Sequence, residues 1–96
     1  MIRHVVMIRW KPEFEQAARQ DWLDRVLALP GKISAIRSLS AGTDVLAANR
    51  SWDVALVADF DSVQDIAGYT AHPDHQPLIA ISTPNAESVA SVDFAI

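Results

Sequence analysis

The feature that most constrains the fold of this chain is a set of strand-like segments whose apolar side chains fall on both alternating faces. In an extended strand, successive side chains point to opposite faces, so a half-solvated strand alternates apolar and polar residues. In residues 2–10, Val6 and Ile8 share one face. Val5 and Met7 share the other. Two later segments have the same property, and we therefore expect both faces of the resulting sheet to be covered.

The segments around these strands predict helices and an order of elements. Pro12 suits the first turn of a helix, which Pro30 and Gly31 end. Ser62 followed by Asp65 resembles a capping box and predicts the start of a second helix. The expected elements are, in chain order, a strand at 2–10, a helix from 12 to about 29, strands at 36–45 and 53–60, a helix from 62 to 72, a short helical segment at 74–82 and a strand at 89–96.

This order of elements defines the fold class. A β-α-β-β-α-β chain is the split βαβ pattern of an α+β, ferredoxin-like fold, with an antiparallel four-stranded sheet and the helices on one face. Because the bare face is also apolar, a like sheet is its simplest cover, and we expect a homodimer that closes an α+β barrel. We treat residues 1–96 as a single domain, since no linker-like stretch divides them and a chain this short fills one core.

Composition argues against several classes of function. The chain has no cysteine, so it offers no disulfide framework and no thiolate nucleophile, which suits a reducing compartment. A formal charge of −4 with scattered basic residues predicts no nucleic-acid partner. The apolar runs are too short to span a bilayer, so we expect no membrane association and a cytoplasmic location. The three glycines are isolated and form no phosphate loop, so we expect any catalysis to need no cofactor.

Six motifs, taken in order, extend over nearly the whole chain. They are His4-Val5-Val6, Leu29-Pro30-Gly31-Lys32-Ile33, Ile36-Arg37-Ser38-Leu39, Trp52 to Phe60, Tyr69-Thr70-Ala71-His72-Pro73-Asp74-His75 and Val92-Asp93-Phe94. This ordered set resembles the stress-responsive A/B barrel family, also called Dabb, of dimeric α+β barrels. The resemblance implies the dimer argued above and adds a candidate pocket between the helices and the sheet.

The resemblance also implies roles for particular residues. One plant branch of the family is a polyketide cyclase that closes a ring by aldol condensation. Its catalytic tyrosine and histidine belong to a Tyr-x-x-His-Pro-x-His segment and fall here on Tyr69 and His75. The histidine of the first strand falls on His4. It shares a strand face with Val6 and Ile8, which by the resemblance is the helix-covered face.

The chemistry of Tyr69 and His75 agrees with such a role. Histidine exchanges a proton near neutrality, and a tyrosine hydroxyl can donate a hydrogen bond to a carbonyl that becomes an enolate. The pair is then a base and a donor, provided that the turn at His72-Pro73 brings the two side chains together. In the alternative interpretation, Tyr69 is a half-buried core residue and His75 bonds a backbone carbonyl.

Four further residues are candidates for ligand binding. These are His4, Val6, Ile8 and His72. The alternative for His4 is a core histidine with satisfied hydrogen bonds, and the alternative for His72 is a cap at a helix C-terminus.

A metal site is not expected. His72, Asp74 and His75 resemble a metal cluster, but Pro73 interrupts the regular helix that would bring both rings together. Asp93 is expected at the rim of the sheet or at an interface.

Three functions remain open at this stage. The first is a cofactor-independent enzyme, a cyclase or isomerase that acts on an apolar, polyketide-like carbonyl compound. The second is a non-catalytic dimer that binds a small molecule or serves in a stress response. The third is a structural dimer that serves another protein. Catalysis requires His75 and Tyr69 to meet, whereas the other two functions do not.

Overall fold

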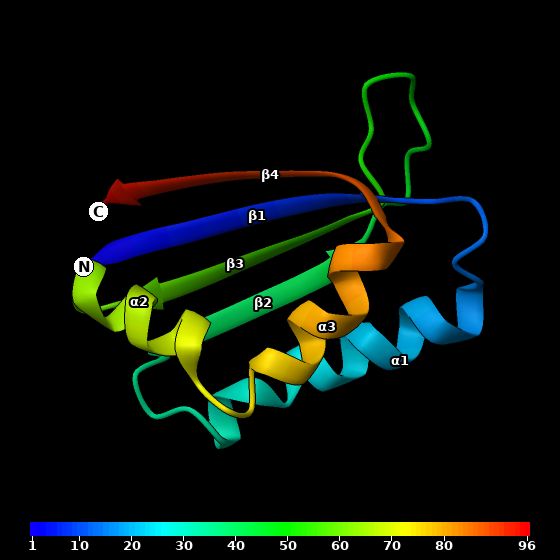
Figure 1. Cartoon of the computed structure of the whole chain (residues 1–96). Coiled ribbons are helices and arrows are strands. Elements are labelled where there is room, and N and C mark those ends of the chain that lie inside the picture. The colour runs from blue at the N-terminus through cyan, green and yellow to red at the C-terminus, as the bar shows by residue number, and fades with distance from the viewer.

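The computed structural model describes residues 1–96 and shows four strands and three helices (Figure 1). The elements are β1 (Ile2–Trp10), α1 (Gln16–Leu27), β2 (Ser38–Thr43), β3 (Val54–Phe60), α2 (Val63–Ala71), α3 (Gln76–Asn85) and β4 (Ala86–Ala95). One turn of 3₁₀ helix, Leu29–Gly31, follows α1. None of the helices combines the length and apolar character needed to cross a membrane.

The four strands form one antiparallel sheet in the order β2-β3-β1-β4. The central strand β1 pairs with β3 on one side and with β4 on the other, so that Val5 lies opposite Val57 and Val92. The helices lie together on one side of the sheet in Figure 1. This arrangement confirms the predicted α+β, ferredoxin-like fold.

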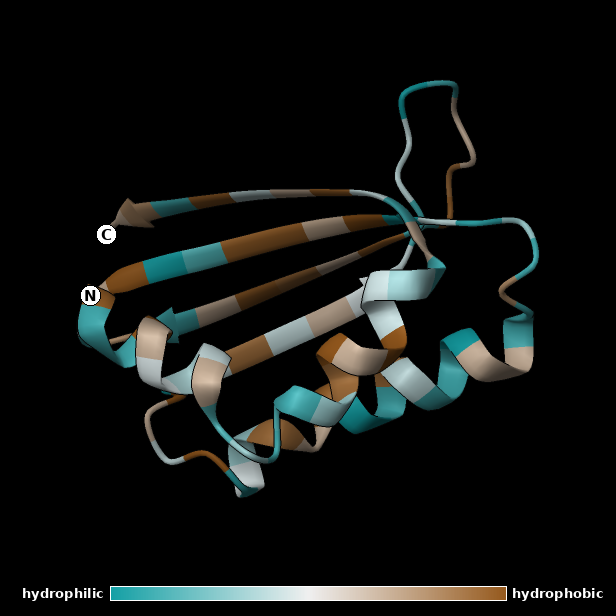
Figure 2. Cartoon of the chain, in the orientation of Figure 1, coloured by the Kyte–Doolittle hydropathy of each residue, from teal (hydrophilic) through white to brown (hydrophobic).

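The helix-covered face of the sheet holds the hydrophobic core. From the strands it takes residues of one parity, and from the helices and their connections it takes buried apolar residues. Figure 2 shows hydrophobic stretches, in brown, both on the strands and on the helices. Its buried members are Ile8, Trp10, Phe14, Trp22, Leu23, Val26, Leu29, Ile33, Ile36, Val54, Leu56, Ala58, Phe60, Tyr69 and Leu78. Trp22 also donates its indole N–H to the carbonyl of Leu78 at 3.2 Å, which ties α1 to α3.

The opposite face, which we call the open face, is apolar at its centre and has no helix over it. Val92 is 56% exposed and Phe94 is 44% exposed there. At one end, Arg3 donates two hydrogen bonds to the carboxylate of Asp59, at 2.9 and 3.0 Å. These bonds hold the pKa of Asp59 below its ordinary value. Apolar residues on both faces, expected from the alternation, are therefore confirmed.

The first helix begins later than expected, at Gln16 instead of Pro12. Residues 12–14 form a turn in which the Phe14 N–H donates to the carbonyl of Lys11 at 3.0 Å. The Phe14 ring turns inward and packs 4.7 Å from the Trp10 ring, centroid to centroid. Burial of this ring stabilises the turn, and α1 begins only after the extended residue Glu15.

Three other elements, β2, β4 and α3, have bounds that differ from the predictions by up to three residues. β2 is shorter than 36–45, since Ile36 is buried in the core ahead of the strand. β4 begins at Ala86 because it pairs with β1 as far as Trp10. The short helical segment expected at 74–82 is α3, and it continues to Asn85.

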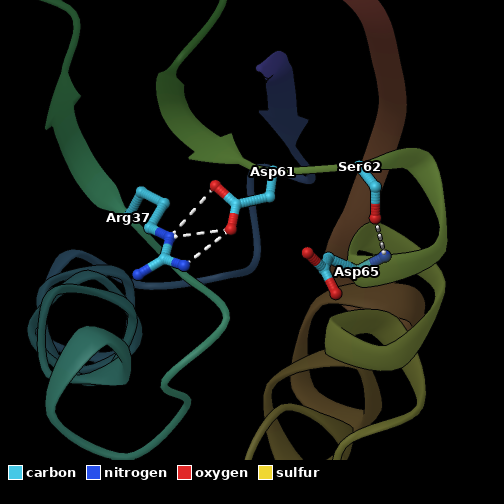
Figure 3. Close-up of polar contacts among 4 residues, drawn as sticks. All are labelled: Arg37, Asp61, Ser62 and Asp65. Atoms are coloured by element: carbon cyan, nitrogen blue, oxygen red, sulfur yellow. Dashed lines mark hydrogen bonds and ion pairs between the residues drawn. The ribbon is translucent and has the colours of Figure 1, made fainter.

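The connection from β3 to α2 shows two polar contacts that define the start of the helix (Figure 3). Ser62 accepts a hydrogen bond from the backbone N–H of Asp65 at 3.2 Å, which confirms the predicted cap. Arg37, just before β2, donates to both carboxylate oxygens of Asp61 and lowers the pKa of that carboxyl group. Together these contacts hold the end of β3 and the first turn of α2 in place.

Candidate active site

Three of the predicted residues meet at one end of the helix-covered side. His4 comes from the start of β1, Tyr69 from the last turn of α2, and His75 from the turn between α2 and α3. The centroids of the Tyr69 and His75 rings are 4.2 Å apart, and those of His4 and Tyr69 are 6.1 Å apart. Phe60 packs 5.1 Å from Tyr69 and forms the apolar floor of the group. We call His4, Tyr69 and His75 the ring cluster.

A backbone contact determines the protonation pattern of His75. Its Nδ1 lies 3.1 Å from the carbonyl oxygen of Thr70. A carbonyl can only accept, so Nδ1 carries the proton and the neutral ring keeps a free lone pair on Nε2. Burial lowers the pKa of His75, the bond to Thr70 opposes that shift, and the charges of His4 and His72 add to it. The neutral, base-competent form is therefore favoured near neutral pH.

Tyr69 is positioned as a hydrogen-bond donor. Its side chain is buried against Phe60, and this burial raises the pKa of the phenol to about 12. The hydroxyl therefore stays protonated at neutral pH. The hydroxyl makes no hydrogen bond within the chain. Because every fully buried side-chain oxygen or nitrogen of the chain has a hydrogen-bond partner, the unpartnered hydroxyl of Tyr69 is not fully buried. The Tyr69 hydroxyl thus keeps contact with accessible space and is free to donate to a ligand.

Asp93 orients His4, a role that the sequence did not reveal. The two residues lie directly opposite each other in the β1–β4 pair, and His4 Nδ1 lies 2.5 Å from the Asp93 carboxylate. The carboxylate accepts the Nδ1 proton, so the lone pair on Nε2 of His4 is also free. Asp93 was predicted only at a sheet rim or an interface. The alternation of side chains shows which residues of one strand share a face. It does not show which residues of two strands lie opposite each other, and that depends on the register between β1 and β4.

His72 lies at the C-terminal end of α2, as a helix cap would. Its Nδ1 accepts the backbone N–H of Asp74 at 3.1 Å. Together with Tyr69 it lines a cavity of about 280 Å³ whose other wall is the loop Lys32–Ala35. Neither His4 nor His75 lines this cavity. No group of three or more histidine, aspartate or glutamate side chains is arranged to hold a metal ion.

The two apolar binding candidates lie deeper than a ligand-contacting residue would. Ile8 is buried in the core, and Val6 is half-buried against it. Neither residue lines the cavity beside Tyr69. Across the strand pair, however, Val6 lies opposite Ser91 and Ile8 opposite Val89, and both of these β4 residues are exposed. The helix-facing side of β4 is therefore an open strip that runs up to His4.

A separate cavity, of about 300 Å³, lies at the other end of the sheet. It is lined by Trp10, Trp52 and polar residues of α1 and of the loop after β2, and it contains none of the predicted site residues. Trp10 is six residues along β1 from His4, which corresponds to about 20 Å in a strand. This cavity is therefore separate from the ring cluster.

The antiparallel sheet with helices on one side defines the class of protein, a ferredoxin-like α+β fold. The family model of the stress responsive A/B barrel domain matches residues 2–96. The chain belongs to this family, as its motifs suggested. Among curated proteins, no sequence matches the chain.

Solved structures support the assignment. A dimeric ferredoxin-like protein of unknown function from Thermobifida fusca is 29% identical, with a TM-score of 0.89 over 99% of this chain and 90% of that one. A dimeric protein of unknown function from Bacteroides fragilis is 27% identical, with a TM-score of 0.83 over 99% of this chain and 95% of that one. The hydroxynitrile lyase of Passiflora edulis shares the fold at 19% identity and a TM-score of 0.86, over 99% of this chain and 92% of that one.

Proposed function

We propose that this protein is a homodimeric barrel that abstracts a proton beside the carbonyl of a small apolar compound, without a cofactor. The observation that carries the proposal is the pairing of Tyr69 with His75. Their rings lie 4.2 Å apart, and the Thr70 carbonyl holds the His75 Nδ1 proton. Nε2 is then the proton acceptor, and the Tyr69 hydroxyl is the donor beside it.

The proposed step moves one proton and one electron pair. His75 Nε2 takes the proton from the carbon next to the carbonyl, and the electrons of the broken C–H bond shift onto the carbonyl oxygen. The Tyr69 hydroxyl donates to this developing enolate oxygen and stabilises its charge. The enolate then takes the proton back from His75 at another position, as in an isomerase. Alternatively, its carbon attacks a second carbonyl within the same molecule, and the oxygen of that carbonyl receives the electron pair of its π bond and the proton from His75, as in an aldol ring closure.

His4 has a supporting place in this proposal. The Asp93 carboxylate accepts its Nδ1 proton, so the ring presents a lone pair on Nε2 near Tyr69. A carboxylate that accepts from one ring nitrogen fixes the tautomer and the orientation of the ring. We assign His4 to ligand binding on the open strip of β4 and leave proton abstraction to His75.

The open face supports the proposed homodimer. A sheet face with exposed valine, methionine and phenylalanine side chains at its centre calls for a cover. The neighbours from Thermobifida fusca and Bacteroides fragilis are both dimeric. In addition, β2 and β4 each leave one edge without a partner strand, so two copies placed face to face can close a barrel through these edges.

A second candidate function is a non-catalytic protein that binds a small apolar molecule. The observation that favours it is the separation of base and cavity, since Tyr69 and His72 line the cavity of about 280 Å³ and His75 does not. The lyase from Passiflora edulis supports the catalytic alternative only to the extent that a protein of this fold carries out lyase chemistry.

Deuterium exchange tests the proposal without knowledge of the natural substrate. The probe is 4-phenyl-2-butanone in D₂O, and the loss of its α-proton signals is followed by ¹H NMR. The protein should accelerate exchange over buffer, and His75→Ala should remove about a 100- to 10,000-fold contribution. Tyr69→Phe, which keeps the ring and its packing, should also slow exchange.

Two outcomes decide between the candidates. Loss of exchange in both variants, with melting temperatures near that of the parent protein, supports catalysis by this pair. No acceleration by the parent protein, together with ketone-dependent NMR shifts at Tyr69 and His72, supports the binding protein and contradicts catalysis.

A further inference from the structure

The connection between β2 and β3, residues 44–53, projects from one end of the sheet, and part of it lines the cavity of about 300 Å³ with Trp10 and residues of α1. In Figure 1 it extends from the end of the sheet in the direction away from the helices. We call it the arm. The backbone N–H of Asp44 donates to the carbonyl of Asp53 at 2.9 Å and closes its base. Within it, the Asp44 carboxylate accepts the N–H of Ala47 at 2.7 Å, and Ser51 and Ala48 bond each other. The arm is therefore an ordered projection held by its own contacts.

The tip of the arm presents apolar side chains to solvent. Val45 is 98% exposed and Leu46 is 70% exposed. Ala47, which follows them, has a φ of 55°, and no other residue of the chain, glycine included, has a positive φ. A left-handed alanine persists only where its surroundings hold it. The backbone thus holds Val45 and Leu46 in place at the tip, and neither side chain belongs to the hydrophobic core of its own chain.

The base of the arm is continuous with the open face of the sheet. A hollow of about 180 Å³ is lined by Met7 and Ala55 from that face and by Asp44 and Trp52 from the arm. Arg9, also on the open face, lies over the Trp52 ring at 4.6 Å from its centroid. A copy of the chain that covers the open face therefore also comes close to the arm.

We propose that the arm is part of the dimer interface, in which Val45 and Leu46 of each protomer pack against the partner subunit. The inference rests on the proposed homodimer and adds a contact outside the two sheets. The occupant is a second copy of this chain, because the surface that leads to the arm is the one that the proposed dimer covers. In a two-fold dimer each arm reaches the same surface of the other protomer, so the contact forms twice.

Reactivity of single thiols tests this inference, because the chain has no cysteine of its own. Leu46→Cys places a thiol on the arm, and Val63→Cys places one at the start of α2, on the helix side. Leu46 and Val63 are 70% and 64% exposed in the isolated chain, so the two positions are matched. For each variant, the rate of reaction with iodoacetamide is compared between the dimer and a monomeric reference carrying Val92→Lys. Dividing the rate in the dimer by the rate in the monomeric reference removes the intrinsic reactivity of the thiol at that position.

The expected result is at least about a tenfold slower reaction of the position-46 thiol in the dimer, with no change at position 63. Burial at the interface excludes the reagent, and this is the physical reason. Equal ratios at the two positions, in a protein that sedimentation shows to be dimeric, would overturn the arm contact and leave the homodimer intact. A parent protein that sediments as a monomer at all concentrations overturns the homodimer and the arm contact together.

Discussion

The two faces of the sheet come from the same strands and have different surroundings. On the helix-covered face, Leu56, Ala58 and Phe60 are buried under helices of the same chain. On the open face, Val92 and Phe94 have similar apolar character and remain exposed. The chain itself therefore supplies a cover for one face only. In our proposal, a second copy of the chain covers the other face.

The largest expected effect is a loss of stability on the covered face. Phe60 is fully buried, and Phe60→Ala should lower the free energy of unfolding by about 3–5 kcal/mol through lost burial and a cavity. Phe94→Ala on the open face is the matched control, and in the Val92→Lys monomer it should cost no more than about 1 kcal/mol. Urea unfolding measures both. Equal losses would show that the faces are not different in the isolated chain. Phe60→Leu keeps the test usable if the alanine variant does not fold.

The next effect concerns association and leaves the fold intact. Val92→Lys puts a charge at the centre of the open face and should raise the dimer dissociation constant at least about 100-fold. Val89→Lys is its control on the helix-facing side of the same strand, where Val89 is 59% exposed. Analytical ultracentrifugation gives both constants. A control variant that dissociates as readily as Val92→Lys would mean that the open face is not the interface.

A smaller effect on stability is expected from loss of the N-cap of α2. Ser62→Ala removes the side-chain acceptor of the Asp65 N–H at the start of α2 and should cost about 1 kcal/mol of stability. Ser62→Thr retains an acceptor and should lose less. Thermal unfolding at one protein concentration compares the two. Similar losses would show that the hydroxyl contributes nothing as a cap.

The smallest expected effect on the free energy of unfolding comes from the ionisation of His75. Burial lowers the pKa of His75 below the value of about 6.5 expected in the unfolded chain. As the pH falls below 6.5, the unfolded chain takes up this proton first, so stability decreases until the folded pKa is passed. Above about pH 6.5 both states are neutral at His75, and this contribution is constant.

The variant His75→Gln isolates this effect from those of His4 and His72. Its free energy of unfolding should fall less between pH 7.5 and pH 5 than that of the parent protein. The midpoint of the His75 ring in an NMR titration should also lie below 6.5. An identical pH dependence of parent and variant would contradict the effect of burial on this ring.

The sequence predicted most of the residues of the candidate site, but it predicted fewer of the contacts between them. The Tyr-x-x-His-Pro-x-His segment pointed to Tyr69 and His75, and the turn at Pro73 does bring their rings together. The hydrogen bond from His75 to the carbonyl of Thr70 was not predictable, because a backbone acceptor carries no sequence signal. The pairing of Asp93 with His4 was missed, since it depends on the register between the first and the last strand.

The sequence by itself determined the period of each element and the faces that are apolar. The alternation in β1 predicted a strand with the bounds that the structure shows, and Ser62 predicted the start of α2. These properties depend on neighbouring residues, and local physical chemistry is enough to decide them. Only the tertiary structure shows where α1 begins and that Asp93 pairs with His4. Those outcomes depend on register and packing between distant segments, and no local pattern encodes them.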